Sequence, residues 1–229
     1  VIKGSAVNQD GRSNGITAPN PEAQMEVLVD AYHDAGITPQ DVDYVEAHGT
    51  GTILGDPIEA RALGKVLGYG RDEDKPLLIG SSKTNLGHME SAAGAAGITK
   101  IALAFAHNKI PPTLNFDRPN RYIDFDGDHL EVVTENRDWP RYTGRAMAGV
   151  SGFGFGGTNA HIVLEEYTGP SVEDAPTKGD GGVSVSTVDE DANTGLLKVA
   201  SVVEAIQSAG ITELSDEQVQ KREALMAMA

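Results

Sequence analysis

The chain has 229 residues, 39% of them hydrophobic, so it is long enough to bury a core. Its net charge of −16 argues against nucleic acid or an anionic membrane as a partner. It contains no cysteine, which excludes disulfides, thiolate metal sites and thiol nucleophiles within this stretch. The lack of cysteine fits a cytoplasmic protein, which we expect. No apolar run reaches the roughly 20 residues of a membrane helix, and no signal peptide is visible.

Strands and helices are predicted to alternate from residue 1 to about residue 167, which indicates an α/β layer architecture. A first strand over residues 1–8 precedes a helix that Asn20 caps and Gly36 ends. Helical spacing predicts that the buried face of this helix carries Met25, Leu28, Val29, Tyr32 and Ala35.

The remaining elements alternate in the same way. In chain order they are a strand over 42–47, a helix over 56–68, a strand over 77–80, a helix over 89–107, and strands over 130–133, 145–151 and 160–165. The helix over 89–107 is rich in alanine but contains Gly94 and Gly97, which cost helix stability. We therefore expect both glycines to make a close contact with another backbone or with a substrate.

The composition changes near residue 168. Residues 168–195 are rich in Gly, Ser, Thr, Asp and Pro, and we predict a flexible acidic linker there. Helices are expected over 196–209 and 215–228. Because both ends of the chain resemble cuts, we expect a piece of a longer polypeptide, with residues 1–167 as its main domain and residues 196–229 as the start of another.

Two short motifs each place a histidine among small residues after a predicted strand. Residues 46–52 (EAHGTGT) contain His48, and residues 82–88 (SKTNLGH) contain Lys83 and His88. Strand ends are where α/β proteins usually bind ligands, and glycine allows a substrate to approach the backbone. Histidine exchanges protons and donates hydrogen bonds near neutral pH. We therefore predict one active site assembled from two loops, with His88 near the N-terminus of the Ala-rich helix.

Residues 152–157 (GFGFGG) match the dinucleotide fingerprint GxGxxG in form. That fingerprint requires a helix after the glycines, whereas residues 158–164 have strand character. A mobile gate or an oxyanion-binding turn beside a pocket is the better interpretation.

A metal site is the main alternative that the residues themselves allow. His48, His88, Asp56 and Glu59 could supply nitrogen and oxygen ligands, although no HExxH motif is present, and we expect no metal. Asp56 and Glu59 are expected instead to cap their helix and brace the His48 loop. The other expectations are structural: His33, His107 and His129 as structural or exposed residues, and Trp139 as a packing residue.

Five motifs together resemble a known family. They are residues 8–15 (NQDGRSNG), 46–52, 55–59 (GDPIE), 83–88 and 152–161. This pattern is similar to the C-terminal half of a β-ketoacyl synthase from a modular type I polyketide synthase. Residues 122–126 (YIDFD) and 138–142 (DWPRY) look most like the synthase that condenses mycolic acids in corynebacteria and mycobacteria.

The resemblance implies a thiolase-like fold, layered α-β-α-β-α, of which this chain is the C-terminal half, and a homodimer. It implies decarboxylative Claisen condensation of an acyl thioester with a malonyl-type extender, in polyketide, fatty acid or mycolic acid synthesis. The substrates would arrive on the phosphopantetheine arm of an acyl carrier protein, and no cofactor would bind directly. The N-terminal half of the ketosynthase and a downstream acyltransferase domain would be the other partners, and residues 196–229 would be the start of the linker domain between the ketosynthase and the acyltransferase.

Carried over by motif, the resemblance assigns roles to several residues. His48 and His88 would bind the extender carbonyl, and Lys83 would support their hydrogen-bond network. The backbone N–H of Phe155 would supply half of an oxyanion hole, and its ring would gate the pocket. The implied supporting residues are Gly154 and Gly156 in the same turn, Thr50, Thr52, Asn85 and Phe153 as substrate-binding residues, and Asp56, Glu59 and Glu90 as structural residues near the site.

The missing cysteine is the departure from the family. The nucleophile of such synthases belongs to the N-terminal half, so we predict that the isolated chain is inactive. The alternative is a non-catalytic ketosynthase-like protein that docks carrier proteins or shapes the pocket. The presence of His48, His88 and Lys83 favours the catalytic interpretation.

Overall fold

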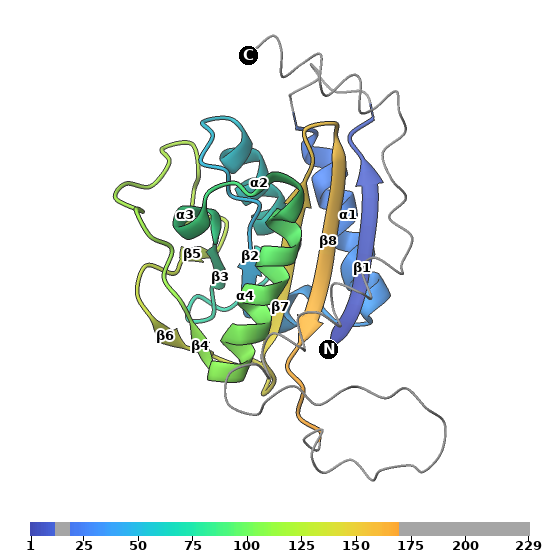
Figure 1. Cartoon of the computed structure of the whole chain (residues 1–229). Coiled ribbons are helices and arrows are strands. Elements are labelled where there is room, and N and C mark those ends of the chain that lie inside the picture. The colour runs from blue at the N-terminus through green and yellow to red at the C-terminus, as the bar shows by residue number, and fades with distance from the viewer. Residues whose placement is uncertain (12–18, 170–229) are drawn as a thin grey trace, which may run out of the picture. The chain divides into compact units, whose positions relative to one another are not determined.

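The computed structural model describes residues 1–11 and 19–169 (Figure 1). The two helices expected after residue 195, and the predicted linker from residue 170 onward, lie outside the described residues. Within the described part, strands and helices alternate as predicted, and the architecture below is that of these residues alone.

The centre of the fold is a six-stranded mixed sheet in the order β1-β8-β7-β2-β3-β5. β2 is parallel to both β7 and β3, and β3 is parallel to β5, whereas β8 is antiparallel to its neighbours β7 and β1. A two-stranded sheet of β4 and β6 is separate. The strand bounds are β1 Ile2–Gln9, β2 Tyr44–Glu46, β3 Leu77–Gly80, β4 Lys109–Ile110, β5 Leu130–Val132, β6 Arg137–Asp138, β7 Met147–Phe153 and β8 Thr158–Glu165.

Helices cover both faces of the sheet (Figure 1). α1 (Pro21–Ala35) and α2 (Gly55–Leu63, continued by a π-helical turn over Gly64–Gly68) pack on one face, and α4 (Ala93–His107) packs on the other. The short helix α3 (Lys83–Leu86) and 3₁₀ turns over Pro39–Asp41 and Glu90–Ala92 lie in the connections. Among the described residues, no helix combines the length and the hydropathy that crossing a membrane requires.

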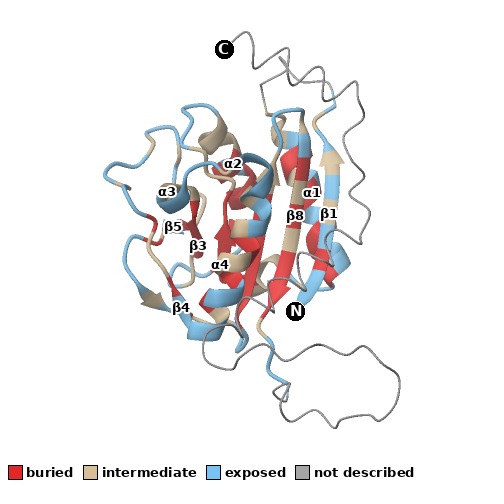
Figure 2. Ribbon diagram, in the orientation of Figure 1, coloured by how far each residue is buried: buried red, intermediate tan, exposed pale blue. Residues whose placement is uncertain are grey.

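The core follows from strand alternation, because successive side chains of a strand point to opposite faces. In β2, Val45 joins the apolar cluster under α1 and α2, which includes Leu28, Leu63 and Val163. Tyr44 and Glu46 point the other way, toward Lys100 on α4. The strands at the centre of the sheet are the most buried part of the molecule, while the outer side of α4 is exposed (Figure 2).

The first helix forms as predicted, with one error in its buried face. The Asn20 side chain accepts hydrogen bonds from the N–H groups of Glu22 and Ala23, and Gly36 ends the helix at φ 65°. However, Val29 is 54% exposed, whereas Gln24 is buried. The prediction for Val29 is wrong because helical spacing identifies a buried face by its apolar residues alone, and the buried Gln24 falls outside that pattern.

The Ala-rich helix begins later than predicted. Met89 and Glu90 have left-handed backbone angles, with φ of 51° and 46°, and no α-helix continues through such residues. α4 therefore starts at Ala93, and His88 lies in the preceding loop rather than at the helix N-terminus. Of its two glycines only Gly97 makes the expected close contact, since a Cβ atom there would lie 2.9 Å from Val150 Cγ1. Gly94 is exposed, and a Cβ atom there would meet nothing described within 4 Å.

Candidate active site

The two histidine loops meet at the carboxyl ends of β2 and β3. These strands are parallel neighbours, with Glu46 opposite Gly80, so the loops that follow them emerge side by side. The backbone N–H of Ala47 donates to the Gly80 carbonyl at 2.8 Å. Gly49, at φ +42°, lies so close to Ser81 that a Cβ atom would be 2.9 Å from the Ser81 Cβ. A residue larger than glycine would push the two loops apart.

The imidazole rings of His48 and His88 lie edge to face, with centroids 5.6 Å apart and planes at 80°. His48 Nδ1 accepts a hydrogen bond from the backbone N–H of Phe153 at 3.3 Å. His88 Nδ1 accepts one from the backbone N–H of Glu90 at 3.2 Å. A ring nitrogen that accepts an N–H carries no proton of its own, so each neutral ring holds its proton on Nε2. The site therefore has two Nε2–H donors for one ligand.

His48 is neutral at physiological pH. Burial, the largest cause, together with the positive charge of Lys83 lowers its pKa to about 4. The ring of Phe153 lies 5.4 Å from the His48 ring and covers part of it. His48 thus donates a hydrogen bond as an uncharged group, while His88 is exposed.

The orientation of His88 depends on the left-handed residues that follow it. With Met89 and Glu90 in this conformation, the chain turns back and brings the Glu90 N–H to the His88 ring. Left-handed non-glycine residues are costly and collect at functional sites. The left-handed pair Met89 and Glu90, which delays the start of α4, therefore also sets the tautomer of His88.

Two acidic side chains of α2 accept hydrogen bonds from the backbone of the His48 loop. Glu59 on α2 is buried and accepts from the backbone N–H groups of His48 (2.7 Å) and Gly49 (2.9 Å). Asp56 accepts from the Gly51 N–H at 3.1 Å. Burial raises the pKa of Glu59 to about 7, although the two N–H donors oppose the rise. The loop backbone is thus tied to the first turns of α2.

Lys83 supplies a positive charge near His48. Burial lowers the pKa of its ammonium group, and the negative charges of Glu59 and Glu46 oppose that effect. Lys83 begins α3, so its position follows directly from the end of β3.

The glycine-rich segment forms the turn between β7 and β8. The strand character of residues 158–164 predicted this turn. Gly154 donates to the Thr158 carbonyl at 2.7 Å, and the backbone N–H of Asp10 donates to the Gly157 carbonyl at 2.7 Å. The N–H of Phe155 makes no hydrogen bond within the described residues, and its ring is 65% exposed. Gly156 is also exposed in this turn. The aromatic ring in contact with His48 is that of Phe153, whereas Phe155 is exposed.

The expected substrate-binding hydroxyls and amide lie at the same end of the sheet. Thr52 Oγ1 accepts from the N–H of Gly55, the first residue of α2, at 3.0 Å. Asn85 is exposed, and its Oδ1 accepts from the hydroxyl of Thr84 at 2.9 Å. Thr50 is half-buried.

Other polar groups serve the frame. His33 and His107 are exposed, and His129 lies in a left-handed turn. Trp139 is buried, and its Nε1–H donates to Asp43 at 2.7 Å. Among the described residues, no group of three His, Asp or Glu side chains is placed to hold a metal ion.

A buried network behind the β7–β8 turn was not predicted from the sequence. His161 lies between the Tyr32 hydroxyl and the Ser151 hydroxyl, each 3.0 Å from a ring nitrogen. Burial lowers the pKa of His161 to about 3. The periodicity of β8 does place residue 161 on the buried face, but it does not reveal the partners.

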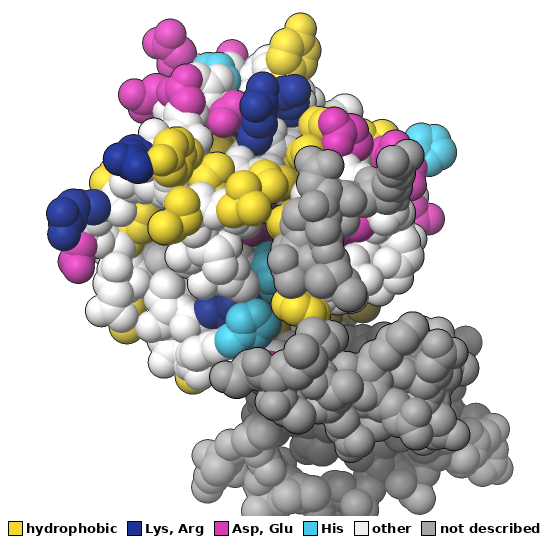
Figure 3. Space-filling model, turned by 90° about the horizontal axis from the view of Figure 1, so that it is seen from above, with side chains coloured by type: hydrophobic (Ala, Val, Ile, Leu, Met, Phe, Trp, Pro, Cys, Tyr) yellow, Lys and Arg dark blue, Asp and Glu magenta, His cyan; other side chains and the backbone are white. Residues whose placement is uncertain are grey.

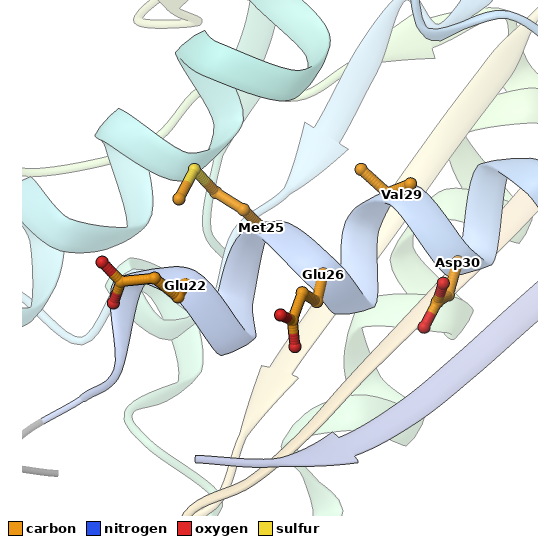
Figure 4. Close-up of a pocket in the computed structure, with 5 residues that line it drawn as sticks. All are labelled: Glu22, Met25, Glu26, Val29 and Asp30. Atoms are coloured by element: carbon orange, nitrogen blue, oxygen red, sulfur yellow. The ribbon is translucent and has the colours of Figure 1, made fainter. Parts of the chain in front are cut away.

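The surface at the site's end of the molecule is partly apolar. Seen from above, histidine and basic side chains lie near hydrophobic ones there (Figure 3). Exposed apolar residues in the site loops include Ile53, Leu54 and Leu86, exposed by 60–76%. A separate hollow lies on the outer face of α1 (Figure 4), and none of the site residues lines it. The described residues that do are Glu22, Met25, Glu26, Val29 and Asp30.

Comparison with protein families gives two matches. The model for the β-ketoacyl synthase C-terminal domain matches residues 1–117, just over half of the chain. The model for the ketoacyl-synthetase C-terminal extension matches residues 119–226.

Similar proteins are polyketide synthases. A component of the phenolphthiocerol/phthiocerol polyketide synthase of Mycobacterium tuberculosis is 62% identical over 179 residues, which are 78% of this chain and 9% of that protein. The erythronolide synthase of Saccharopolyspora erythraea is 50% identical over 193 residues, which are 84% of this chain and 6% of that protein. The chain thus spans less than a tenth of the length of these relatives.

Solved structures agree. The ketosynthase from module 6 of the Bacillus subtilis bacillaene synthase has a TM-score of 0.69 and 48% identity, covering 74% of this chain and 32% of that one. The oxazolomycin ketosynthase domain of Streptomyces albus has a TM-score of 0.70 and 40% identity, covering 75% and 31%. These likenesses confirm the expected thiolase-like fold and its C-terminal half.

Proposed function

The chain belongs to the β-ketoacyl synthase family, as the C-terminal ketosynthase domain of a modular type I polyketide synthase, and we propose that it supplies half of a condensing active site. The reaction is the decarboxylative Claisen condensation of an acyl thioester with a malonyl-type extender. The observation that carries the proposal is the pair of Nε2–H donors, set by backbone N–H groups on both Nδ1 atoms.

The two donors suit a thioester carbonyl that becomes an enolate. In the proposed step, the bond between the extender's α-carbon and its carboxylate breaks, and CO₂ leaves. The electron pair moves into the enolate, whose negative oxygen accepts hydrogen bonds from His48 and His88. The α-carbon then forms a C–C bond to the acyl carbonyl of the thioester held on a cysteine, and the enolate returns to a carbonyl. The C–S bond breaks, the cysteine leaves as a thiolate, and the β-ketoacyl product stays on the carrier. Preorganised donors of this kind stabilise developing charge without reorganising.

The remaining residues support this chemistry. The neutral state of His48 matters, because a neutral imidazole donates its hydrogen bond without giving up the proton. Lys83 adds positive charge near the enolate, and Glu59 and Asp56 fix the loop that carries His48. The Phe155 N–H contributes to the oxyanion hole of the acyl thioester, with Gly154 and Gly156 allowing the turn, while the Phe155 ring gates the pocket. Thr50, Thr52 and Asn85 line the approach of the pantetheine arm.

The proposed partners are supported by two features of the chain, its lack of cysteine and its exposed apolar residues. It contains no cysteine, so the nucleophile comes from the N-terminal half of the ketosynthase. The exposed apolar residues at the site's end and on the outer side of α4 fit a surface that this other half covers. An acyl carrier protein brings the substrates, and a homodimer with a downstream acyltransferase domain is the proposed assembly.

The finer substrate class is a long-chain lipid precursor. We expected mycolic acid condensation from residues 122–126 and 138–142, whereas the mycobacterial relative at 62% identity is a phthiocerol synthase. The name of that relative states its product and no chain length, so the proposal of a long acyl donor for this chain rests on the resemblance of residues 122–126 and 138–142. Condensation rates with carrier-bound acyl chains of increasing length test it, and a preference for short chains would contradict it.

The test of the main proposal uses the complete ketosynthase that carries this sequence. His48→Ala and His88→Ala each remove one donor, so condensation should fall by roughly 100-fold or more. Acyl loading of the cysteine, measured by mass spectrometry, should stay within about threefold of wild type, because the proposed role of both donors belongs to the later decarboxylation step.

The matched control is His107→Ala, since His107 is exposed at the end of α4 and far along the chain from the site. This variant should condense like the wild type. Near-normal condensation by either site variant would contradict the assigned roles and favour the non-catalytic, carrier-docking alternative.

A further inference from the structure

One buried carboxylate at the site has no role in the chemistry above. Glu46, two residues before His48, is only 3% exposed. Its Oε1 accepts from the backbone N–H of Ser82 at 2.5 Å, and its Oε2 accepts from the Lys100 ammonium at 2.6 Å and from the Tyr44 hydroxyl at 2.9 Å. Both oxygens are therefore occupied by groups of three different elements.

These bonds connect the two loops that carry the site. Glu46 ends β2 and leads to His48, while Ser82 lies between β3 and Lys83 at the start of α3. The Ser82–Glu46 bond thus joins the base of the His48 loop to the base of the loop that leads to His88. Lys100 adds the third element, α4, which follows His88 in the chain.

The approach of α4 depends on Gly97, three residues before Lys100. A Cβ atom at Gly97 would lie 3.2 Å from Glu46 Cγ and 2.9 Å from Val150 Cγ1. The absent side chain lets the helix come close enough for the Lys100 ammonium to reach both Glu46 and Tyr44. The cluster is therefore packed as well as hydrogen-bonded.

We propose that Glu46 is a positioning residue, which sets the separation of His48 and His88 through its bond to the Ser82 backbone. This inference rests on the proposed condensation, because the two imidazoles act on one oxygen atom only when their spacing is held. A displacement of about 1 Å in such a pair can cost as much as 100-fold in rate.

Two substitutions separate positioning from general stability. Glu46→Asp keeps the charge near Lys100 but shortens the side chain by one methylene, so the bond to Ser82 is lost. Glu46→Gln keeps an oxygen for Ser82 but leaves the Lys100 ammonium buried without an anion, which is costly to folding. If Glu46 positions the two loops, Glu46→Asp should have the lower condensation rate, and Glu46→Gln should have the lower stability.

The measurements are the kcat and KM of condensation and the Tm of unfolding, in the complete ketosynthase. Glu46→Asp should lose about tenfold or more in kcat, with KM within about twofold and a small loss of Tm. Glu46→Gln should retain kcat within about threefold while its Tm falls further.

Glu166 offers a matched control at the opposite end of the sheet. It also accepts from a backbone N–H, that of Ala146 at 2.9 Å, and from a cation, Arg141 at 2.6 Å. Glu166→Asp and Glu166→Gln should lower Tm and leave kcat unchanged.

Several results would overturn the proposal. They are a Glu46→Asp variant with kcat within twofold of wild type, a folded Glu46→Gln variant that loses more than tenfold, or losses of kcat that simply follow Tm in both pairs of variants. If Glu46→Asp does not fold, the Glu46→Gln result decides. Loss of condensation in His48→Ala with normal kcat in both Glu46 variants would leave the proposed function standing and remove only this inference.

Discussion

β2 carries a polar cluster at each end, and the two clusters are built in opposite ways. Before the strand, Asp43 is fully buried and accepts from Trp139 Nε1 (2.7 Å) and from the backbone N–H groups of Tyr142 (2.8 Å) and Met147 (2.9 Å). After the strand, His48 and His88 each use one ring nitrogen within the protein and direct the other elsewhere. In the Asp43 cluster the carboxylate is bonded to three N–H groups of the protein. In the histidine cluster one ring nitrogen of each imidazole is left to bind a ligand.

The difference shows how one short strand serves both structure and chemistry. Around Asp43, the buried Arg71 guanidinium donates to the carbonyl oxygens of Leu67, Pro39, Val42 and Lys75, so this end is closed by bonds within the chain. A rigid end gives the loops at the other end a fixed base. Substitutions at the closed end should therefore change stability, and those at the open end should change reactivity.

The largest stability effect is expected from Asp43→Ala. It leaves three N–H donors without their acceptor in a buried place, which should cost about 3–5 kcal/mol in the free energy of unfolding. Urea denaturation of the chain measures this cost. Asp72→Ala is the control, because its ion pair with Lys75 is exposed and should contribute less than about 1 kcal/mol. Equal losses in the two variants would contradict the closed cluster.

The buried histidine His161 sharpens the same comparison. Both nitrogens of His161 have partners, and burial lowers its pKa to about 3 from an unfolded value near 6.5. A lowered folded-state pKa adds stability above pH 6.5, and this stability is lost as the pH falls toward 3. The contribution is of the order of 4 kcal/mol.

This pH dependence is measured as the free energy of unfolding between pH 7 and pH 3. In His161→Gln, whose amide can bond to both hydroxyls but does not titrate, the decline over that range should be clearly shallower. An unchanged slope would show that His161 does not drive the acid sensitivity.

The packing of α4 predicts smaller effects of opposite sign at its two glycines. Gly97→Ala places a methyl group 2.9 Å from Val150 Cγ1 and should cost about 1–3 kcal/mol. Gly94→Ala adds a methyl group where no described atom lies within 4 Å, so its helix propensity should stabilise the chain by about 0.5–1 kcal/mol. Thermal denaturation of both variants gives the sign, and a stabilising Gly97→Ala would contradict the close approach of α4 to β2 and β7.

Much of the fold could be predicted because its signals are local. The caps of α1, the apolar strand over 77–80 and the turn over 152–157 each depend on neighbouring residues, and they form as expected. The start of α4 could not be predicted, because alanine favours helix while the left-handed pair Met89 and Glu90 depends on the loop around His88. Tertiary context overrode propensity there.

The site shows the same division. The motifs placed His48, His88 and Lys83 in loops at strand ends, and the parallel pairing of β2 and β3 brings those loops together. The sequence could not reveal that Glu46 bonds to Ser82 across 36 positions, or that His161 bonds to Tyr32 across 129. Such long-range polar contacts leave no periodic pattern in the chain.

The central claim is that both site imidazoles present Nε2–H, and long-range ¹H–¹⁵N NMR of the imidazole rings tests it most directly. At pH 7.5, with signals assigned from His48→Ala and His88→Ala, both rings should give the pattern of the Nε2–H tautomer. A predominant Nδ1–H tautomer at either ring would contradict the account, because that ring would then accept a hydrogen bond where the enolate oxygen needs a donor.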